Sequence, residues 1–245
     1  MGVKRGYVFS DSHMFSFRST FDEGSCAELL SKNSPDFLVL NGDIFDFRWS
    51  RYRSIERSIS EALEWLLALI GRYPRCHFYY LLGNHDSLSA FTGRLRDLAL
   101  RERNFSLYPF YLRLGNSLFL HGDVTQVGGD PALLEDYRGA FDIEKGRGIS
   151  MELLYRVVVS LRLQTVVPFL ISREKLAESL VRYFKAVAPS DLAEVDNIYF
   201  GHVHKRFDHY RYGRWSFFNT GASIKGLRSD FIELRLSYRG PTGGA

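Results

Sequence analysis

The order of apolar and polar positions in the first half of the chain alternates between the patterns of buried strands and amphipathic helices. Continuous apolar runs at 6–10, 36–41 and 77–82 predict strands. Residues 26–32 and 54–70 predict the helices between them. In the second helix the apolar positions recur every three or four residues, at Ile55, Ile59, Ala62, Leu63, Leu66, Leu67 and Ile70. This β-α-β-α-β order predicts an α/β fold with a parallel sheet at its core.

The second half of the chain has a different pattern. Residues 110–120 predict a β-hairpin in which Gly115 and Asn116 form a two-residue turn. Residues from about 130 to 190 predict a helical insertion, with Ser172 as the N-cap of a helix whose apolar stripe consists of Leu176, Leu180 and Phe184. Further strands, which would complete the fold in antiparallel fashion, are then predicted at 197–200, 207–219 and 230–236.

Composition narrows the class of protein. The chain has 245 residues, 45% hydrophobic and 24% charged, and no window of about 18 uncharged apolar residues that would span a membrane. Its net charge of +4 is too small to indicate a nucleic-acid surface. Two cysteines, Cys26 and Cys76, exclude a disulfide scaffold and a cysteine-based metal cluster. The first residues lack a signal-peptide pattern, so we expect a cytoplasmic protein.

Polar side chains follow five of the predicted strands directly. In open α/β sheets the carboxyl ends of parallel strands border the ligand crevice, so we expect these side chains to converge. A buried group of carboxylates and imidazoles is costly unless it is neutralised, and metal ions are its natural partner. The segments are Asp11-Ser12-His13, Asn41-Gly42-Asp43 with Asp46 beyond it, Gly83-Asn84-His85-Asp86, His121-Gly122-Asp123 and Gly201-His202-Val203-His204.

The ligand types and spacings predict two metal ions. Imidazole and carboxylate without thiolate suit Mn, Fe or Zn better than Ca or Mg alone. Asp11 and His13 are two residues apart, so in an extended segment both would face the same way and hold one ion. Seven candidate ligands exceed what one ion readily takes, whereas two ions bridged by a carboxylate would use them all. The candidates are Asp11, His13, Asp43, Asn84, His121, His202 and His204.

The motifs D-x-H, G-D-x-x-D, G-N-H-D, H-G-D and G-H-x-H, in this order, resemble the signature of the calcineurin-like metallophosphoesterases. The resemblance implies a single domain over residues 1–245. Its fold would be a four-layer αββα sandwich of two mixed sheets, with a helical cap inserted at about 130–190.

The resemblance also implies roles for the site residues. One ion would be held by Asp11, His13, Asp43 and His204, and the other by Asp43, Asn84, His121 and His202, with Asp43 bridging. His85 would lie over the phosphoryl group and Asp86 would orient its ring. A hydroxide bridging two divalent ions, Mn first and Fe or Zn as alternatives, would attack phosphorus.

Within this superfamily the chain resembles the branch of UDP-2,3-diacylglucosamine diphosphatase, an enzyme of lipid A synthesis. The resemblance lies in the length, the insertion and the closing segment 219–222. It implies an acylated diphosphate substrate, a lid at 151–170 that receives acyl chains, and peripheral contact with the inner membrane. This chain departs from the branch at one position, because those enzymes typically carry arginine where this chain has His85. Three arginines are candidates for gripping a diphosphate or a base: Arg48, Arg51 and Arg53.

Other interpretations remain open at this point. The protein could be a generic phosphodiesterase or phosphatase acting on a soluble nucleotide or other small phosphoester, or a nuclease, although the small net charge makes nucleic acid an unlikely partner. A binding scaffold is a further class, which predicts missing motif residues; none is missing. Asp46 and Asp123 either support neighbouring histidines or lie in solvated turns. The sequence does not indicate an oligomeric state.

Overall fold

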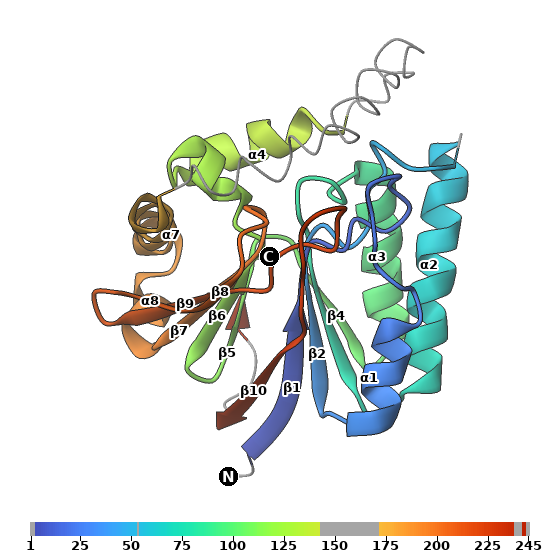
Figure 1. Cartoon of the computed structure of the whole chain (residues 1–245), viewed down its shortest axis with the longest axis horizontal. Coiled ribbons are helices and arrows are strands. Elements are labelled where there is room, and N and C mark those ends of the chain that lie inside the picture. The colour runs from blue at the N-terminus through green and yellow to red at the C-terminus, as the bar shows by residue number, and fades with distance from the viewer. Residues whose placement is uncertain (1–2, 53, 143–171, 238–241, 244–245) are drawn as a thin grey trace.

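The protein is described by a computed structural model that covers residues 3–52, 54–142, 172–237 and 242–243. Two mixed β-sheets face each other, and helices lie against the outer side of each, so that the chain forms four layers (Figure 1). This arrangement confirms the predicted α/β sandwich of two mixed sheets.

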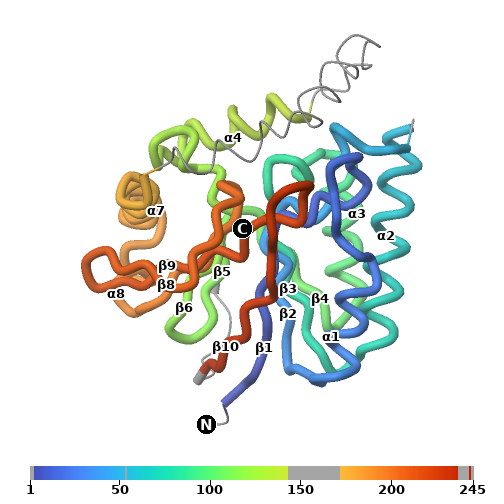
Figure 2. The backbone as a smooth tube through the Cα atoms, in the orientation of Figure 1, coloured from blue at the N-terminus to red at the C-terminus, as the bar shows by residue number. Residues whose placement is uncertain are grey.

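The first sheet has the strand order β10-β1-β2-β3-β4. Four of its strands are parallel to one another, and β10 pairs with β1 in the antiparallel sense. The N-terminal strand therefore lies beside a strand from near the other end of the chain, as the blue and red tubes in Figure 2 show. The strands are β1 (Val3–Phe9), β2 (Phe37–Asn41), β3 (His77–Leu81), β4 (Phe105–Tyr108) and β10 (Ile232–Ser237).

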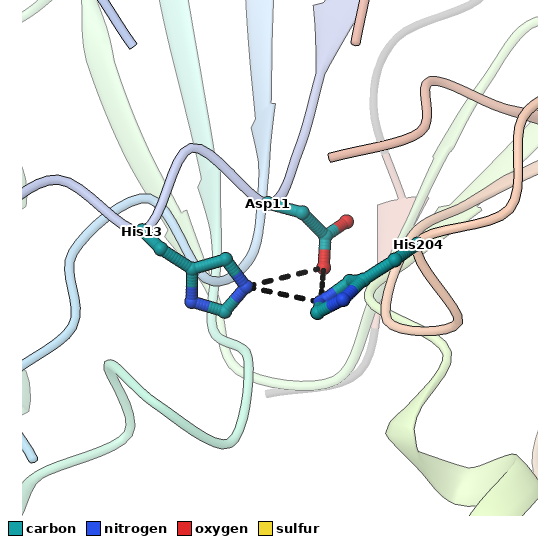
Figure 3. A group of neighbouring side chains, drawn as sticks. All are labelled: Asp11, His13 and His204. Atoms are coloured by element: carbon teal, nitrogen blue, oxygen red, sulfur yellow. Dashed lines mark hydrogen bonds and ion pairs between the residues drawn. The ribbon is translucent and has the colours of Figure 1, made fainter. Parts of the chain in front are cut away.

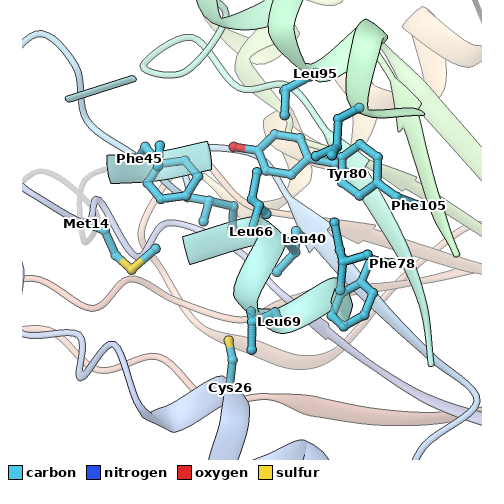
Figure 4. Close-up of a cluster of buried hydrophobic side chains, with 14 of the residues drawn as sticks. Met14, Cys26, Leu40, Phe45, Leu66, Leu69, Phe78, Tyr80, Leu95 and Phe105 are labelled. Carbon is cyan, nitrogen blue, oxygen red and sulfur yellow. The ribbon is translucent and has the colours of Figure 1, made fainter. Parts of the chain in front are cut away.

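Three helices cover the outer face of this sheet: α1 (Ser25–Asn33), α2 (Ile55–Arg72) and α3 (Ser89–Arg101) (Figure 1). Helix α2 begins where predicted, because the Ser54 hydroxyl accepts the Arg57 N–H at 3.3 Å. Its apolar stripe packs into the core under the helices, where Leu66 lies among aromatic side chains from the sheet and the loops (Figure 4). Burial of this apolar surface is the main term that holds the helices to the sheet.

The second sheet has the strand order β11-β5-β6-β7-β9-β8. Its outer face packs against α7 (Arg173–Val187) and α8 (Pro189–Glu194). Ser172 caps α7 and Leu176, Leu180 and Phe184 are buried, as predicted. The strands are β5 (Tyr111–Leu114), β6 (Ser117–Leu120), β7 (Asn197–Phe200), β8 (Phe207–Tyr212), β9 (Trp215–Asn219) and β11 (Thr242–Gly243). The predicted strand at 197–200 is not antiparallel, because β7 runs parallel to β6 and to β9 on either side of it.

A core between the two sheets fixes how their loops meet. The rings of Phe119 and Tyr199 stack at 5.0 Å between centroids, and Tyr199 also stacks on Phe218 at 4.8 Å. Val39 and Leu81 of the first sheet belong to the same buried cluster. Because this core holds the sheets against each other, the loops at the ends of β1, β2, β3, β6 and β7 are brought to one place.

The predicted elements of the first half are confirmed, with two omissions. The sequence pattern gave no expectation for α3 or β4, which lie between the predicted strand at 77–82 and the predicted hairpin. Two helices of the described part, α4 (Pro131–Gly139) and α7, fall in the range 130–190. The predicted lid at 151–170 lies outside the described residues. Among the residues described, no helix has the length and apolar character needed to cross a membrane.

Candidate metal centre

The predicted metal ligands come together at the ends of the two sheets. They form two groups in which one ligand atom from each residue lies within 4.8 Å of the others. Asp11, His13 and His204 make the first group. Asp43, His121 and His202 make the second. Asn84, the seventh candidate, is buried in the loop that follows β3.

The first group joins loops from both sheets (Figure 3). His204 Nε2 lies 3.4 Å from Asp11 Oδ1 and 3.1 Å from His13 Nε2. The backbone N–H of His202 donates to both oxygens of Asp11 at 3.0 Å, and this bond ties the loop after β7 to the loop after β1. Ser10 also donates its hydroxyl to Asp11. The three side chains in Figure 3 thus point toward one another from fixed backbone positions.

The physical reason for this convergence differs from the one predicted. Asp11 and His13 do not sit in an extended segment: their φ angles are +52° and +45°. His202 and His204 likewise have φ of +68° and +56°. Left-handed backbone is uncommon for residues with a Cβ and costs of order 1 kcal/mol or more at each position. The tightly curled loops, not strand alternation, aim these side chains at one point.

Asp43 links the two groups. Its Oδ2 lies 3.3 Å from His121 Nε2 and 3.9 Å from His13 Nε2. Its other oxygen accepts the His85 N–H at 2.8 Å. Gly83 lies directly against this carboxylate, and a Cβ at that position would collide with it. The Asp43 side chain therefore touches both histidine groups while its orientation is fixed by the loop after β3.

The histidines of the site differ in their electrostatic environment. Burial, reinforced by Arg18, lowers the pKa of His13 well below its ordinary value, and burial lowers the pKa of His202 to about 4. Both imidazoles are thus neutral near pH 7, as metal ligands must be. Burial also opposes protonation of His121, but the adjacent Asp43 carboxylate outweighs it and raises the pKa of His121 to about 10. A cation bound beside Asp43 would compete with that proton.

The donor set fits a pair of divalent cations. Three buried atoms of the candidate ligands have no hydrogen-bond partner among the described residues: Asn84 Oδ1, His121 Nε2 and His202 Nε2. Buried polar atoms are rarely left in this state unless they bind an ion or water. Two imidazoles, once His121 has given up its proton to solvent, together with a carboxylate and an amide oxygen, are typical ligands of a divalent transition metal. The second group therefore has the chemistry of a metal site, and the first supplies two imidazoles and a carboxylate beside it.

The carboxylate next to His85 is Asp46, and not Asp86 as predicted. Asp46 Oδ1 lies 3.1 Å from His85 Nδ1. Asp86 instead accepts bonds from the Tyr80 hydroxyl at 2.7 Å and from the N–H groups of Gly83 at 2.7 Å and Ile44 at 2.9 Å. It fastens the loops after β2 and β3 to each other. Burial, together with Asp43, raises the pKa of Asp86 to about 7.

His85 and Asp46 form a polarised pair. Burial opposes the charge on each of them, but their mutual attraction outweighs it, so the pKa of His85 is raised and that of Asp46 is lowered. The His85 side chain is 13% exposed and Asp46 is fully buried. Because Nδ1 faces Asp46, the nitrogen of His85 that is left for a substrate is Nε2.

Arg18 is a residue of the site that the sequence pattern did not single out. Its Nη2 lies 3.1 Å from His13 Nδ1 and 3.6 Å from Asp46 Oδ2. His13, Asp46 and His85 also lie within metal-binding distance of one another, but this guanidinium already supplies their positive charge. We therefore do not assign a third metal site there. Nothing in the local sequence pattern of Arg18 distinguishes it from a surface arginine.

Aromatic side chains of α4 and the residues that follow it lie beside the centre. The Phe141 ring is 5.4 Å from that of His85, and the Tyr137 ring is 6.4 Å from that of His202. The predicted substrate residue Arg48 is exposed and lies over Phe141 at 5.2 Å. Arg51 pairs with Glu23 at 2.9 Å, and Arg53 is outside the described residues. Of the two described arginines, Arg48 is the one placed beside the centre.

Comparison with known proteins assigns a family. The sequence model of the calcineurin-like phosphoesterases matches residues 5–206, which is most of the chain. No curated protein sequence matches it. Among solved structures it is similar to a dimetal phosphatase from Danio rerio, with 10% identity, 96% of this chain and 99% of that chain covered and a TM-score of 0.47. It is also similar to Vps29 from Chaetomium thermophilum, with 12% identity, coverage of 94% and 74% and a TM-score of 0.35.

Proposed function

We propose that this chain, which belongs to the calcineurin-like phosphoesterase family and is a hydrolase acting on phosphoester bonds, cleaves a phosphodiester or diphosphate with the help of two divalent cations. The observation that carries this proposal is the position of Asp43, whose carboxylate touches histidines of both ligand groups. One cation would be held by Asp11, His13, Asp43 and His204. The other would be held by Asp43, Asn84, His121 and His202.

The bound cations would supply Lewis-acid stabilisation of the phosphoryl oxygens and lower the pKa of water. The protein's own groups would do the rest. His85, whose pKa is raised by its attraction to Asp46, would donate a hydrogen bond from Nε2 to a phosphoryl or leaving-group oxygen. Asp46 would hold the ring in that orientation, and Arg48 would meet a second anionic or planar part of the substrate.

We also propose the identity of the metal and of the substrate. Manganese is proposed first, since a set of imidazoles and carboxylates suits it, with iron and zinc as alternatives. A UDP-diacylglucosamine-like diphosphate is proposed on the resemblance of the sequence to the lipid A enzymes, with a cytoplasmic location and peripheral membrane contact. The presence of His85 favours the second candidate, a soluble diester or nucleotide, because generic phosphatases of the superfamily carry histidine there.

A substrate panel tests both levels. The full chain is freed of metal, reloaded with Mn²⁺, Fe²⁺ or Zn²⁺, and assayed on bis-p-nitrophenyl phosphate, p-nitrophenyl phosphate, a UDP-sugar, UDP-diacylglucosamine and single-stranded DNA. We expect metal-dependent release of product that EDTA abolishes. Turnover of the diphosphate only when it carries acyl chains would select the lipid substrate, and comparable turnover of the simple diester would select the generic activity. Full activity in EDTA would contradict the proposal.

A further inference from the structure

Arg138 is a buried arginine on α4 whose three guanidinium nitrogens all donate hydrogen bonds. Its side chain is 8% exposed. Nε and Nη2 donate to the two oxygens of Asp123 at 2.6 and 3.0 Å. Nη2 also donates to the Leu82 carbonyl at 2.9 Å, and Nη1 to the Pro109 carbonyl at 2.5 Å. This guanidinium is thus joined to three separate segments of the chain.

Two of these acceptors lie beside the metal ligands. Asp123 ends the H-G-D motif, two residues after His121, and Leu82 directly precedes the G-N-H-D motif. These motifs follow β6 and β3, which belong to different sheets. One side chain from α4 therefore holds the helix to both halves of the candidate metal centre.

The same stretch of chain carries the aromatic side chains beside the site. We call Tyr137 and Phe141, whose rings pack on each other at 5.4 Å, the ring pair. One of its rings faces His202 and the other faces His85. A second contact holds the end of this segment, since the Ser89 N–H of α3 donates to Asp142 at 2.8 Å. The position of the ring pair thus depends on how α4 is anchored.

We propose that Arg138 is a positioning residue that acts through α4 and holds the ring pair beside the metal centre. In that place the ring pair receives the part of the phosphoester that is not transferred. The proposal rests on the proposed function. A contribution to the stability of the fold does not by itself explain this arginine, because an apolar side chain of similar volume often stabilises a protein as well as a buried ion pair does. What an apolar side chain lacks is a set of directional bonds to three segments, which fixes the orientation of the helix.

A double-mutant cycle separates positioning from stability. With Mn²⁺ and bis-p-nitrophenyl phosphate, we expect R138M to raise KM at least tenfold while kcat stays within about threefold. In a Y137A/F141A background the same substitution should change KM less than twofold, because its effect passes through the ring pair. R138K keeps the charge but not the fork of donors, so its KM should fall between those of the wild type and R138M. If R138M fails to fold, R138K takes its place in the cycle.

The matched control is Arg113, which makes the same kind of contacts away from the ligand motifs. It pairs with Asp191 at 2.9 Å and with Glu194 at 2.6 Å, and its Nε donates to the Gly115 carbonyl at 3.2 Å. R113M should lower the Tm and leave KM unchanged. A wild-type KM in both R138M and R138K would overturn the proposal, and so would an undiminished effect in the Y137A/F141A background.

Amide hydrogen exchange keeps the test independent of activity. R138M should speed exchange in α4 by at least tenfold relative to the wild type, whereas R113M should leave α4 unchanged. Equal protection of α4 in R138M and the wild type would overturn the proposal. If the wild type hydrolyses no phosphoester with any metal, the proposed function fails on its own, and the exchange measurement still decides whether Arg138 anchors the helix.

Discussion

Because Asp43 contacts both ligand groups, the effect of metal on the stability of the fold can be predicted quantitatively. A ligand present at 100 times its Kd stabilises the folded state by about 2.7 kcal/mol. Two cations would therefore contribute about 5 kcal/mol. For a chain of 245 residues, each kcal/mol shifts the Tm by about 2–4 °C, so saturating Mn²⁺ should raise the Tm of the metal-free protein by about 10–20 °C.

The variant D43N should lose this rise almost entirely, because Asp43 touches the histidines of both groups. Asparagine keeps an oxygen that can accept the His85 N–H, so the metal-free variant should still fold. H204A should keep about half of the rise, since His204 belongs to one group only. The matched control is D191N, which makes the same change in a carboxylate that pairs with Arg113 and should keep the full rise.

The assay is thermal unfolding of each variant with and without Mn²⁺, so that differences in intrinsic stability cancel. Metal content after desalting gives an independent count, which we expect to be two ions for the wild type, one for H204A and none for D43N. A D43N protein that retains two ions and the whole temperature rise would refute the idea that one carboxylate serves both sites.

Three further predictions concern single residues. H85A should keep the metal-dependent rise in Tm but lose about 10²–10³ in kcat on bis-p-nitrophenyl phosphate, because a proton donor and not a metal ligand is removed; loss of metal would contradict that role. G83A should lose most of its activity, because the new Cβ would collide with the Asp43 carboxylate, whereas in G71A the new Cβ would meet nothing within 4 Å beyond its own helix, so this variant should be as active as the wild type. Burial raises the pKa of Cys76 to about 12 and that of Cys26 further, so at pH 8 neither thiol should react with a disulfide reagent until the protein is unfolded, and rapid labelling of the native protein would contradict this.

Much of the fold follows from local patterns, and the omissions have physical reasons. Helix α2 has both a cap at Ser54 and a long apolar stripe, so its pattern is strong. Helix α3 has neither a side-chain cap nor an uninterrupted stripe: Gly93 lies within it, and the N–H and hydroxyl of its first residue, Ser89, find their acceptor in Asp142 of a distant segment. Strand β4 has four residues and Ser106 breaks its apolar run, whereas β7, of the same length, ends in three consecutive apolar residues.

The candidate site was predictable as a set of residues but not as a geometry. Motif order pointed to the seven candidate ligands, whereas assigning Asp46 or Asp86 to His85 required the path of each loop. Both carboxylates lie in motifs, and sequence distance favours Asp86, the direct neighbour of His85. In the folded chain Asp86 faces β3 and the loop after β2, so the more distant residue meets the imidazole.

Backbone strain is concentrated at the candidate ligands. Of the non-glycine residues with positive φ in the described part of the chain, five are candidate ligands: Asp11, His13, Asp43, His202 and His204. Such conformations persist only where surrounding contacts impose them. Here the Asp11 N–H donates to the Gly42 carbonyl at 3.1 Å and the His13 N–H donates to the Asp43 carbonyl at 3.0 Å, so the loops after β1 and β2 hold each other in the curled form. Residue types alone could not reveal this, because aspartate and histidine adopt extended backbone more readily. The loops are therefore shaped by pairing between the ends of neighbouring strands, and the placing of the ligands is a property of the sheet as a whole.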